Sequence, residues 1–310
     1  MSNSIELRDL EKSFRLDLRL GTRRALNGLS LTVRAGEIYG FLGPNGAGKT
    51  TSIKILVSLL RQDRGTALIF GGDPTRNEVR ARIGYLPESP NFYDQLTGRE
   101  FLAFCGKLCG LRGADLRQRS DRLLEEVGLA HAGDLQIRRY SKGMNQRVGI
   151  AQALLHDPEL VILDEPMSGL DPIGRAEVRD LILGLKKRGK TVFFSTHIIP
   201  DVELICDRIG LINRGRMVAE GSVGELLDTA EARPIEVAVE NFSAVTDRSL
   251  AAEVSSVGSQ KLYLVPSDEA LARFIPTVLQ HQGRLVSINP RREGLENLVV
   301  RLLEQDRPAA

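Results

Sequence analysis

Short runs of apolar residues alternate with longer amphipathic stretches along the first two thirds of the chain. Residues 37–42, 160–163 and 191–195 are mostly apolar, which is typical of strands buried on both faces. Residues 50–60 and 173–187 instead carry apolar side chains at helical spacing. Buried strands joined by helices predict an α/β fold whose parallel sheet is covered on both faces.

An all-helical block interrupts this alternation. Its pattern predicts three helices, over residues 97–109, 114–127 and 141–156. Thr97 and Glu100, three positions apart at the start of the first helix, form the pattern of a capping box. We therefore expect a helical subdomain over about residues 97–156, inserted between strands of one sheet.

The pattern changes again near residues 228–234. Beyond this point three stretches alternate as strands do and two have helical spacing: residues 235–239, 261–265 and 284–288, and residues 267–280 and 294–303. We expect two domains, a larger one over residues 1–230 and a small α+β accessory domain over residues 231–310.

Composition excludes several classes of protein. The chain has 310 residues, 42% of them hydrophobic and 26% charged, close to the averages for soluble globular proteins. Its formal net charge of +2 is too small for a protein that coats nucleic acid, so we expect no nucleic-acid partner. Three cysteines do not make a disulfide framework. Apolar runs fall far short of the roughly 20 residues of a membrane helix, and the N-terminus has charges where a signal peptide is apolar. We expect a cytoplasmic protein.

A glycine-rich loop follows the first apolar strand and opens a helix. Its sequence, GPNGAGKT, fits the phosphate-binding pattern G-x-x-x-x-G-K-[ST]. Glycines let successive backbone N–H groups turn toward a triphosphate, and the helix adds the positive end of its dipole. We expect Lys49 to reach the β- and γ-phosphates and the Thr50 hydroxyl to ligate Mg²⁺. The predicted nucleotide-binding residues here are Gly43, Pro44, Asn45, Gly46, Ala47, Gly48, Lys49, Thr50 and Thr51.

Two carboxylates follow the apolar run at residues 160–163. Asp164 occupies the strand end at which P-loop enzymes hold Mg²⁺ through water. Glu165, the next residue, is placed to polarise the attacking water. Together with the glycine-rich loop, this pair predicts a nucleotide-hydrolysing enzyme.

The motif that narrows the class lies before Asp164, in residues 140–147, YSKGMNQR. Ser141 is placed to cap the following helix, whose free N–H groups suit a γ-phosphate. Here the chain resembles the ABC ATPases, the nucleotide-binding subunits of ABC transporters. Their signature, Leu-Ser-Gly-Gly-Gln, is retained in part as Ser141 and Gly143. The resemblance implies that both residues bind the nucleotide.

Further motifs follow in the family's order, so the resemblance extends over about residues 5–227. Residues 168–171, SGLD, match the D-loop, which implies that Asp171 lies at the nucleotide. His197 matches the switch histidine that contacts the γ-phosphate, which implies a catalytic role beside Lys49 and Glu165. Phe14 stands where the family has an aromatic residue that stacks on adenine.

Three positions depart from the family pattern. Glu88 replaces the Q-loop glutamine; a carboxylate can face Mg²⁺ or the lytic water but does not donate a hydrogen bond as an amide does. We expect Glu88 to join Thr50 and Asp164 at the metal. Lys142 and Met144 also differ from the signature. Chains with Leu-Pro-Glu and Tyr-Ser-Lys-Gly-Met are similar to the drug-resistance-type branch, whose partners are ABC-2-type exporter permeases.

The resemblance implies a function and partners. In the family two subunits pair head to tail, which would place ATP between Lys49 of one copy and Ser141 of the other. We expect a homodimeric, ATP-hydrolysing subunit at the inner face of the cell membrane that energises export through separate permease subunits, with ATP and Mg²⁺ as cofactors. A soluble non-transport ABC-type ATPase and a nucleotide-dependent regulatory protein are the alternatives.

Residues 91–93, NFY, are unusually aromatic for a loop in a chain with 5% aromatic residues. In the family the surface that contacts the permease includes this region, here residues 88–100 with Tyr93. The aromatic segment either lines a groove for a partner helix or closes a hydrophobic lid over the helical subdomain.

A basic stretch near the N-terminus contains Arg15, Arg19, Arg23 and Arg24. We expect a solvated loop or hairpin here, with contact to anionic lipid beside a membrane partner as the alternative.

Overall fold

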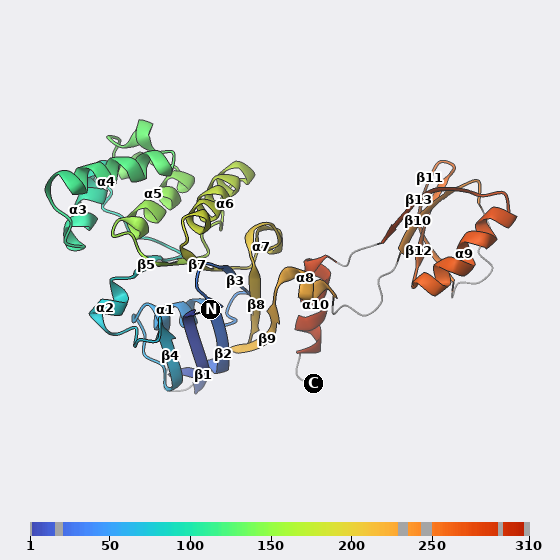
Figure 1. The fold of residues 1–310 in the computed structure, drawn as a ribbon, viewed down its shortest axis with the longest axis horizontal. Helices are drawn as coiled ribbons and strands as arrows, with labels where there is room; N and C mark the ends of the chain where they lie inside the picture. The colour runs from blue at the N-terminus through green and yellow to red at the C-terminus, as the bar shows by residue number, and fades with distance from the viewer. Residues whose placement is uncertain (1, 16–20, 229–234, 243–249, 291–293, 307–310) are drawn as a thin grey trace. The chain divides into compact units, whose positions relative to one another are not determined.

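The computed structural model describes residues 2–15, 21–228, 235–242, 250–290 and 294–306 of the chain. Contacts divide the chain into two compact units, Met1–Val223 with Leu302–Ala310, and Gly224–Arg301 (Figure 1). Each unit has its own sheet or sheets and its own apolar core.

A six-stranded sheet in the order β5-β6-β7-β3-β8-β9 forms the centre of the first unit. Its strands are β3 (Ile38–Leu42), β5 (Ile83–Leu86), β6 (Leu160–Asp164), β7 (Thr191–Thr196), β8 (Arg208–Asn213) and β9 (Arg216–Gly221). The first five of these run parallel to their neighbours, whereas β9 pairs antiparallel with β8. Every residue of β3, β6 and β7 is buried, as the apolar runs predicted. The sheet is nevertheless mixed, because of β9.

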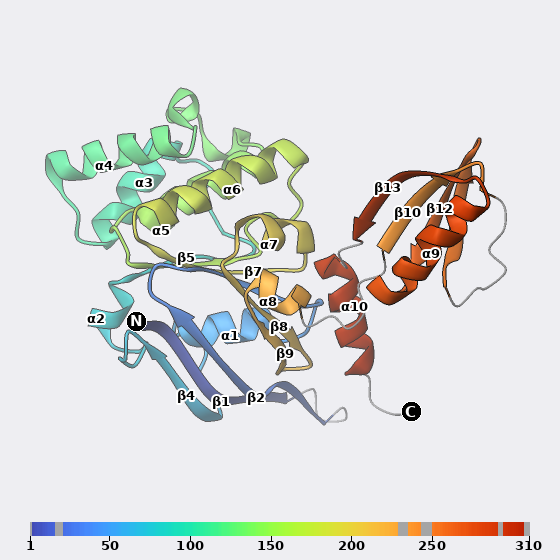
Figure 2. The ribbon, with the colours of Figure 1, turned by 45° about the vertical axis from the view of Figure 1, so that its right-hand side comes forward.

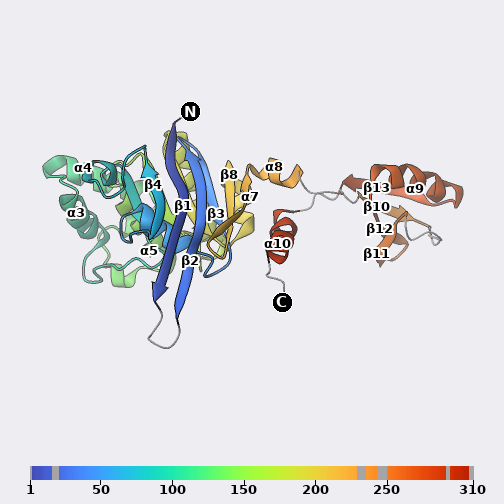
Figure 3. The same cartoon turned by 90° about the horizontal axis from the view of Figure 1, so that it is seen from below.

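A second, antiparallel sheet that the apolar pattern did not reveal packs in the same unit. It consists of β1 (Asn3–Arg15), β2 (Thr22–Arg34) and β4 (Arg64–Ile69), in the order β2-β1-β4. Apolar side chains of this sheet, such as Leu29, share one core with Ile53 of α1 (Lys49–Leu56) and Phe193 of β7. Figure 3 shows β1 and β2 side by side along their length. The phosphate-loop helix α1 therefore lies between the two sheets.

Helices cover the opposite face of the central sheet (Figure 2). Those that contact the sheet are α5 (Lys142–Leu154), α6 (Pro172–Lys187) and α7 (Ile199–Ile205). α3 (Gly98–Leu108) and α4 (Gly113–Glu126) pack against α5, and the short α2 (Asn77–Arg80) precedes β5. The predicted capping box is present, since the Thr97 hydroxyl accepts from the Glu100 N–H and the Glu100 carboxylate accepts from the Thr97 N–H. All three helices expected between residues 97 and 156 are confirmed within a few residues at their ends.

The second unit contains a four-stranded antiparallel sheet in the order β11-β12-β10-β13. Its elements are α8 (Val223–Asp228), β10 (Ile235–Glu240), β11 (Ala252–Val257), β12 (Gln260–Val265), α9 (Asp268–Gln280), β13 (Arg284–Pro290) and α10 (Leu295–Gln305), the last of which extends into the first unit. Phe274 and Val278 of α9 pack against Val237 and Tyr263 of the sheet. The expected α+β character of this part is confirmed, and β11 is an additional strand. Among the described residues, no helix is long and apolar enough to cross a membrane.

Candidate active site

The glycine-rich loop connects the end of β3 with the first residue of α1. Gly46 and Gly48 have φ angles of +79° and +117°, which residues with a side chain rarely adopt. A Cβ at Gly48 would also lie 2.8 Å from the carbonyl oxygen of Ala25. Glycine at these positions is therefore required by the backbone, which brings the loop into a tight turn above the sheet.

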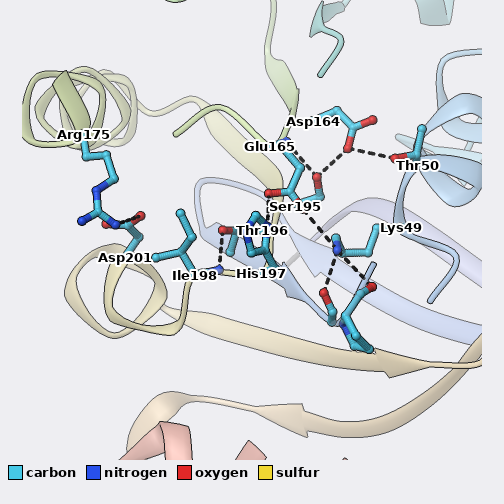
Figure 4. A network of polar contacts seen from close by, with 12 residues as sticks. Lys49, Thr50, Asp164, Glu165, Arg175, Ser195, Thr196, His197, Ile198 and Asp201 are labelled. Carbon is cyan, nitrogen blue, oxygen red and sulfur yellow. Dashed lines mark hydrogen bonds and ion pairs between the residues drawn. The ribbon is translucent and has the colours of Figure 1, made fainter. Parts of the chain in front are cut away.

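Lys49 folds back over this loop and points to the sheet end (Figure 4). Its Nζ donates hydrogen bonds to the carbonyl oxygens of Gly43 at 2.6 Å and Pro44 at 3.3 Å. The same nitrogen lies 3.2 Å from Oε1 of Glu165 in an ion pair. Both side chains are at most 6% exposed, so the two charges are shielded from water.

Asp164 has one satisfied and one unsatisfied carboxylate oxygen. Oδ1 accepts hydrogen bonds from the Ser195 hydroxyl at 2.6 Å and the Thr50 hydroxyl at 3.4 Å. Oδ2 is buried and has no hydrogen-bond partner among the described residues. Burial raises the pKa of Asp164. An unpaired buried carboxylate oxygen beside a threonine hydroxyl fits a hard cation or its bound water.

Glu165 is held in a strained and buried position. Its φ angle is +52°, unusual for a residue with a side chain, and its N–H donates to the Ser195 hydroxyl at 2.9 Å. Its second carboxylate oxygen, Oε2, hydrogen-bonds Nδ1 of His197 at 2.8 Å. These residues meet because β6 and β7 are adjacent parallel strands, with Asp164 paired to Ser195 at their carboxyl ends.

A cavity of about 420 Å³ opens beside these side chains. Residues predicted from several separate motifs line it: Phe14, Pro44, Asn45, Gly46, Gly48, Lys49, Thr50, Thr51, Glu88 and Glu165. Arg23 and Ala25 of β2 complete its wall. The fold thus gathers the glycine-rich loop, the strand-end glutamate, the aromatic residue and Glu88 around one space large enough for a small ligand.

Ser141, Gly143 and Asp171 do not line this cavity in the described structure. Ser141 is the N-cap of α5, where its hydroxyl accepts from the Met144 N–H at 3.2 Å. Asp171 is the N-cap of α6, where Oδ1 accepts from the Gly174 N–H at 2.9 Å. The nucleotide-binding residues expected from the sequence therefore fall into two groups on one chain.

Comparison with known proteins decides the family. The family model "ABC transporter" matches residues 26–168. An uncharacterized ABC transporter ATP-binding protein, all4389 of Nostoc sp., is 41% identical over 307 residues, which cover 96% of this chain and 89% of that protein. The chain belongs to the ATP-binding subunits of ABC transporters. It is an ABC ATPase, which binds and hydrolyses ATP.

Two further matches bear on this ABC ATPase. The daunorubicin/doxorubicin resistance ATP-binding protein DrrA of Streptomyces peucetius is 39% identical over 256 residues, or 81% of this chain and 77% of DrrA. The solved dimeric post-hydrolysis structure of the ATP-binding cassette MJ0796 with ADP and Pi has a TM-score of 0.64 and 25% identity. It covers 70% of this chain and 98% of that one.

Two groups of residues in the ABC ATPase were not anticipated from its sequence. Ser195 connects Asp164 with the backbone of Glu165, and its place two residues before His197 at a strand end was the available signal. Asp201 of α7 is 1% exposed and accepts a hydrogen bond from Arg179 of α6 at 2.9 Å. Figure 4 shows its ion pair with Arg175 of the same helix, at 3.9 Å. This pair joins the helix capped by Asp171 to the helix that follows His197.

The basic stretch of the ABC ATPase takes the form of a hairpin. Arg15 ends β1, while Arg23 and Arg24 belong to β2, which pairs antiparallel with it. Arg19 lies outside the described residues. The expected hairpin is confirmed for the described part, and Arg23 of this hairpin lines the cavity.

Proposed function

We propose that this ABC ATPase works as a head-to-tail homodimer and energises export through separate permease subunits. The division of its nucleotide residues into two groups carries the dimer proposal. The cavity around Lys49 supplies one half of a site, and Ser141 with Gly143 and Asp171 supplies the other half from the second copy. The dimeric MJ0796 cassette, a relative in fold, supports this arrangement.

In each composite site the glycine-rich loop and Lys49 bind the phosphates of ATP, and Phe14 stacks on adenine. Ser141 and Gly143 of the second copy present the N-terminal end of α5 to the γ-phosphate, where its free N–H groups and dipole favour an anion. Loss of the γ-phosphate on hydrolysis then weakens the contact between the two copies.

Glu165 acts as the general base toward the attacking water, with His197 as its hydrogen-bonded neighbour. Glu165 is paired with Lys49, a cation that phosphate oxygens also bind. A γ-phosphate competes for the same ammonium group. Binding of ATP therefore separates Glu165 from its cation and leaves its carboxylate free to face the attacking water.

Thr50, Asp164 and Glu88 would hold Mg²⁺, which neutralises charge on the β- and γ-phosphate oxygens when bound. The unpaired buried Oδ2 of Asp164 supports this assignment. Glu88 lines the cavity and is close enough to raise the pKa of Asp164 through their like charges, although burial is the larger cause. Two carboxylates near each other are more stable with a cation between them.

The aromatic segment offers a surface for the permease. Phe92 packs edge-on against Phe101, as expected of a lid. Tyr93 packs on Phe104 but is 55% exposed, and Leu108 at the end of α3 is 74% exposed. Phe92 thus helps to close the lid, while Tyr93 and Leu108 leave an exposed apolar surface beside it. This surface suits a helix of a membrane partner. The resistance function in DrrA's name supports an exporter at the inner face of the cell membrane.

The experiment is a pull-down from solubilised membranes with the Glu165→Gln variant and Mg-ATP. We expect an integral membrane protein to co-purify. Adding Leu108→Glu should abolish its recovery, whereas Leu59→Glu, a comparably exposed leucine after α1, should not. Recovery of ribosomes, DNA or only a soluble homodimer would instead support a non-transport ATPase or a regulatory protein.

A further inference from the structure

Arg23 lines the cavity together with Phe14 and the glycine-rich loop. In the β1–β2 pairing it lies directly opposite Phe14, and both residues line the cavity wall. Its Nη2 also lies 3.1 Å from the position that a Cβ would take on Gly46 of the glycine-rich loop. The guanidinium therefore lies against the loop, beside the aromatic residue.

Two cationic side chains line the cavity, Lys49 and Arg23, and they differ in their hydrogen-bond and ion-pair partners. Lys49 is held by two carbonyl oxygens and by Glu165. Arg23 makes no hydrogen bond or ion pair with any residue that the structure describes. None of its five N–H donors has a partner among the described residues, and a guanidinium binds phosphate oxygens in a fork.

We propose that Arg23 is a nucleotide-binding residue that contacts the phosphate nearest the sugar in nucleoside di- and triphosphates. This inference rests on the proposed site, in which the base lies on Phe14 and the terminal phosphates lie on the glycine-rich loop. A group that lies opposite Phe14 and against Gly46 reaches the part of the ligand between base and terminal phosphates. Arg23 then contributes to ground-state binding rather than to the chemical step.

Arg24 provides a matched control on the same strand. The next residue of a strand points to the opposite face, and Arg24 donates instead to the side-chain oxygen of Asn27 at 2.7 Å. It does not line the cavity. Arg24→Ala therefore removes the same charge from the neighbouring position without removing a residue that lines the cavity.

The test measures binding of ATP and ADP to the full chain by calorimetry, together with steady-state hydrolysis. We expect Arg23→Ala to weaken both affinities about tenfold, the lower range for hydrogen bonds to a charged group, because the site is open to water. The KM should rise by a similar factor with kcat within about twofold, since uniform binding is lost. Arg23→Lys should recover part of the affinity, because it restores the charge but not the fork.

Equal affinities for Arg23→Ala and Arg24→Ala would overturn the inference, as would a fall in kcat with KM unchanged. Arg23 is exposed, so melting temperatures should match the wild type and exclude misfolding. Lys49→Ala separates this inference from the proposed site. If Lys49→Ala loses ATP while Arg23→Ala keeps it, only Arg23 is wrongly assigned; if neither changes ATP binding, the proposed site is itself wrong.

Discussion

Lys49 and Glu165 form a buried ion pair, with 3.2 Å between Nζ and Oε1. One residue is proposed to bind the γ-phosphate and the other to activate water. The pair therefore links nucleotide binding to catalysis directly, because the ligand competes with the base for the same cation. A buried ammonium group without a partner is energetically costly. A phosphate that binds Lys49 therefore has to take the place of the Glu165 carboxylate as the nucleotide enters.

Glu165→Gln should retain ATP binding and lose turnover. The amide keeps the size of the side chain but does not accept a proton, and general-base catalysis contributes about 10²- to 10⁴-fold. We expect hydrolysis to fall at least about 100-fold while ATP affinity stays within a few fold. Phosphate release and equilibrium binding measure the two quantities. Glu78→Gln on the exposed side of α2 is the control, and near-wild-type hydrolysis by Glu165→Gln would rule out the base assignment.

Lys49→Ala should weaken ATP binding itself. It removes a charge-assisted contact to the phosphates and leaves the buried Glu165 carboxylate without its cation. The phosphates then meet a negative carboxylate that repels them instead of an ammonium group that attracts them. We expect a loss of affinity of at least about tenfold. Lys54→Ala, on the exposed side of the same helix, should bind as the wild type does. Tight ATP binding by Lys49→Ala would show that the lysine does not hold the phosphates.

Glu88→Gln tests the replacement at the Q-loop position. If Glu88 faces the metal, losing its charge raises the Mg²⁺ concentration required for half-maximal hydrolysis, because an amide oxygen is a weaker ligand than a carboxylate. The measurement is a titration of activity with Mg²⁺ at constant ATP. An unchanged titration curve would remove Glu88 from the metal site and leave it a candidate for contact with the permease.

Asp201→Ala should destabilise the fold. Asp201 is 1% exposed, and its loss leaves Arg179 and Arg175 of α6 without the carboxylate that they share. We expect a loss of roughly 2–4 kcal/mol in the free energy of unfolding. This is somewhat less than the cost of removing one partner of a fully buried ion pair, because both arginines remain partly exposed. Chemical denaturation measures it. Asp180→Ala on the same helix should change stability by less than about 0.5 kcal/mol, and equal effects of both variants would contradict this reading.

The capping box makes the helical subdomain sensitive to acid. The Thr97 N–H, followed by its hydroxyl, lowers the pKa of Glu100 from its ordinary value of 4.5. A lowered pKa means that the ionised carboxylate stabilises the folded state above pH 4.5, and this contribution is lost as the pH falls through the lowered value. The stability advantage of the wild type over Glu100→Gln should therefore shrink on acidification below pH 4.5. A difference independent of pH would show that the charge of Glu100 does not matter.

Three buried strands of the central sheet and three strands of the second unit were predicted from the sequence, whereas most other strands, the buried β8 included, were not. β3, β6 and β7 are buried throughout, have apolar runs and were found, whereas β1 and β2 carry charged residues on an exposed face and bulges that break the alternation. In β2, the buried residues Leu29, Leu31 and Val33 alternate with exposed ones, and this pattern could have predicted the strand. β11 is largely exposed, and its apolar residues Ala252, Val254 and Val257 do not keep the period of two that marks a strand.

Much of the site was accessible from sequence because parallel strands end at one edge of the sheet. Lys49, Asp164 and His197 belong to motifs at such ends, and the structure brings their neighbourhoods together. Arg23 was not accessible, because its place depends on the register of β1 against β2. Asp201 was hidden for a similar reason, since its partners lie on another helix and no local pattern connects them.

The most direct test of the composite site is the mass of the Glu165→Gln variant in solution with Mg-ATP, measured by light scattering. We predict twice the chain mass of 34.1 kDa with ATP and a single chain without it. Adding Ser141→Arg should leave ATP bound but keep the protein at the mass of one chain. A dimer that survives Ser141→Arg, or no ATP-dependent dimer at all, would contradict a site shared between Lys49 of one copy and Ser141 of the other.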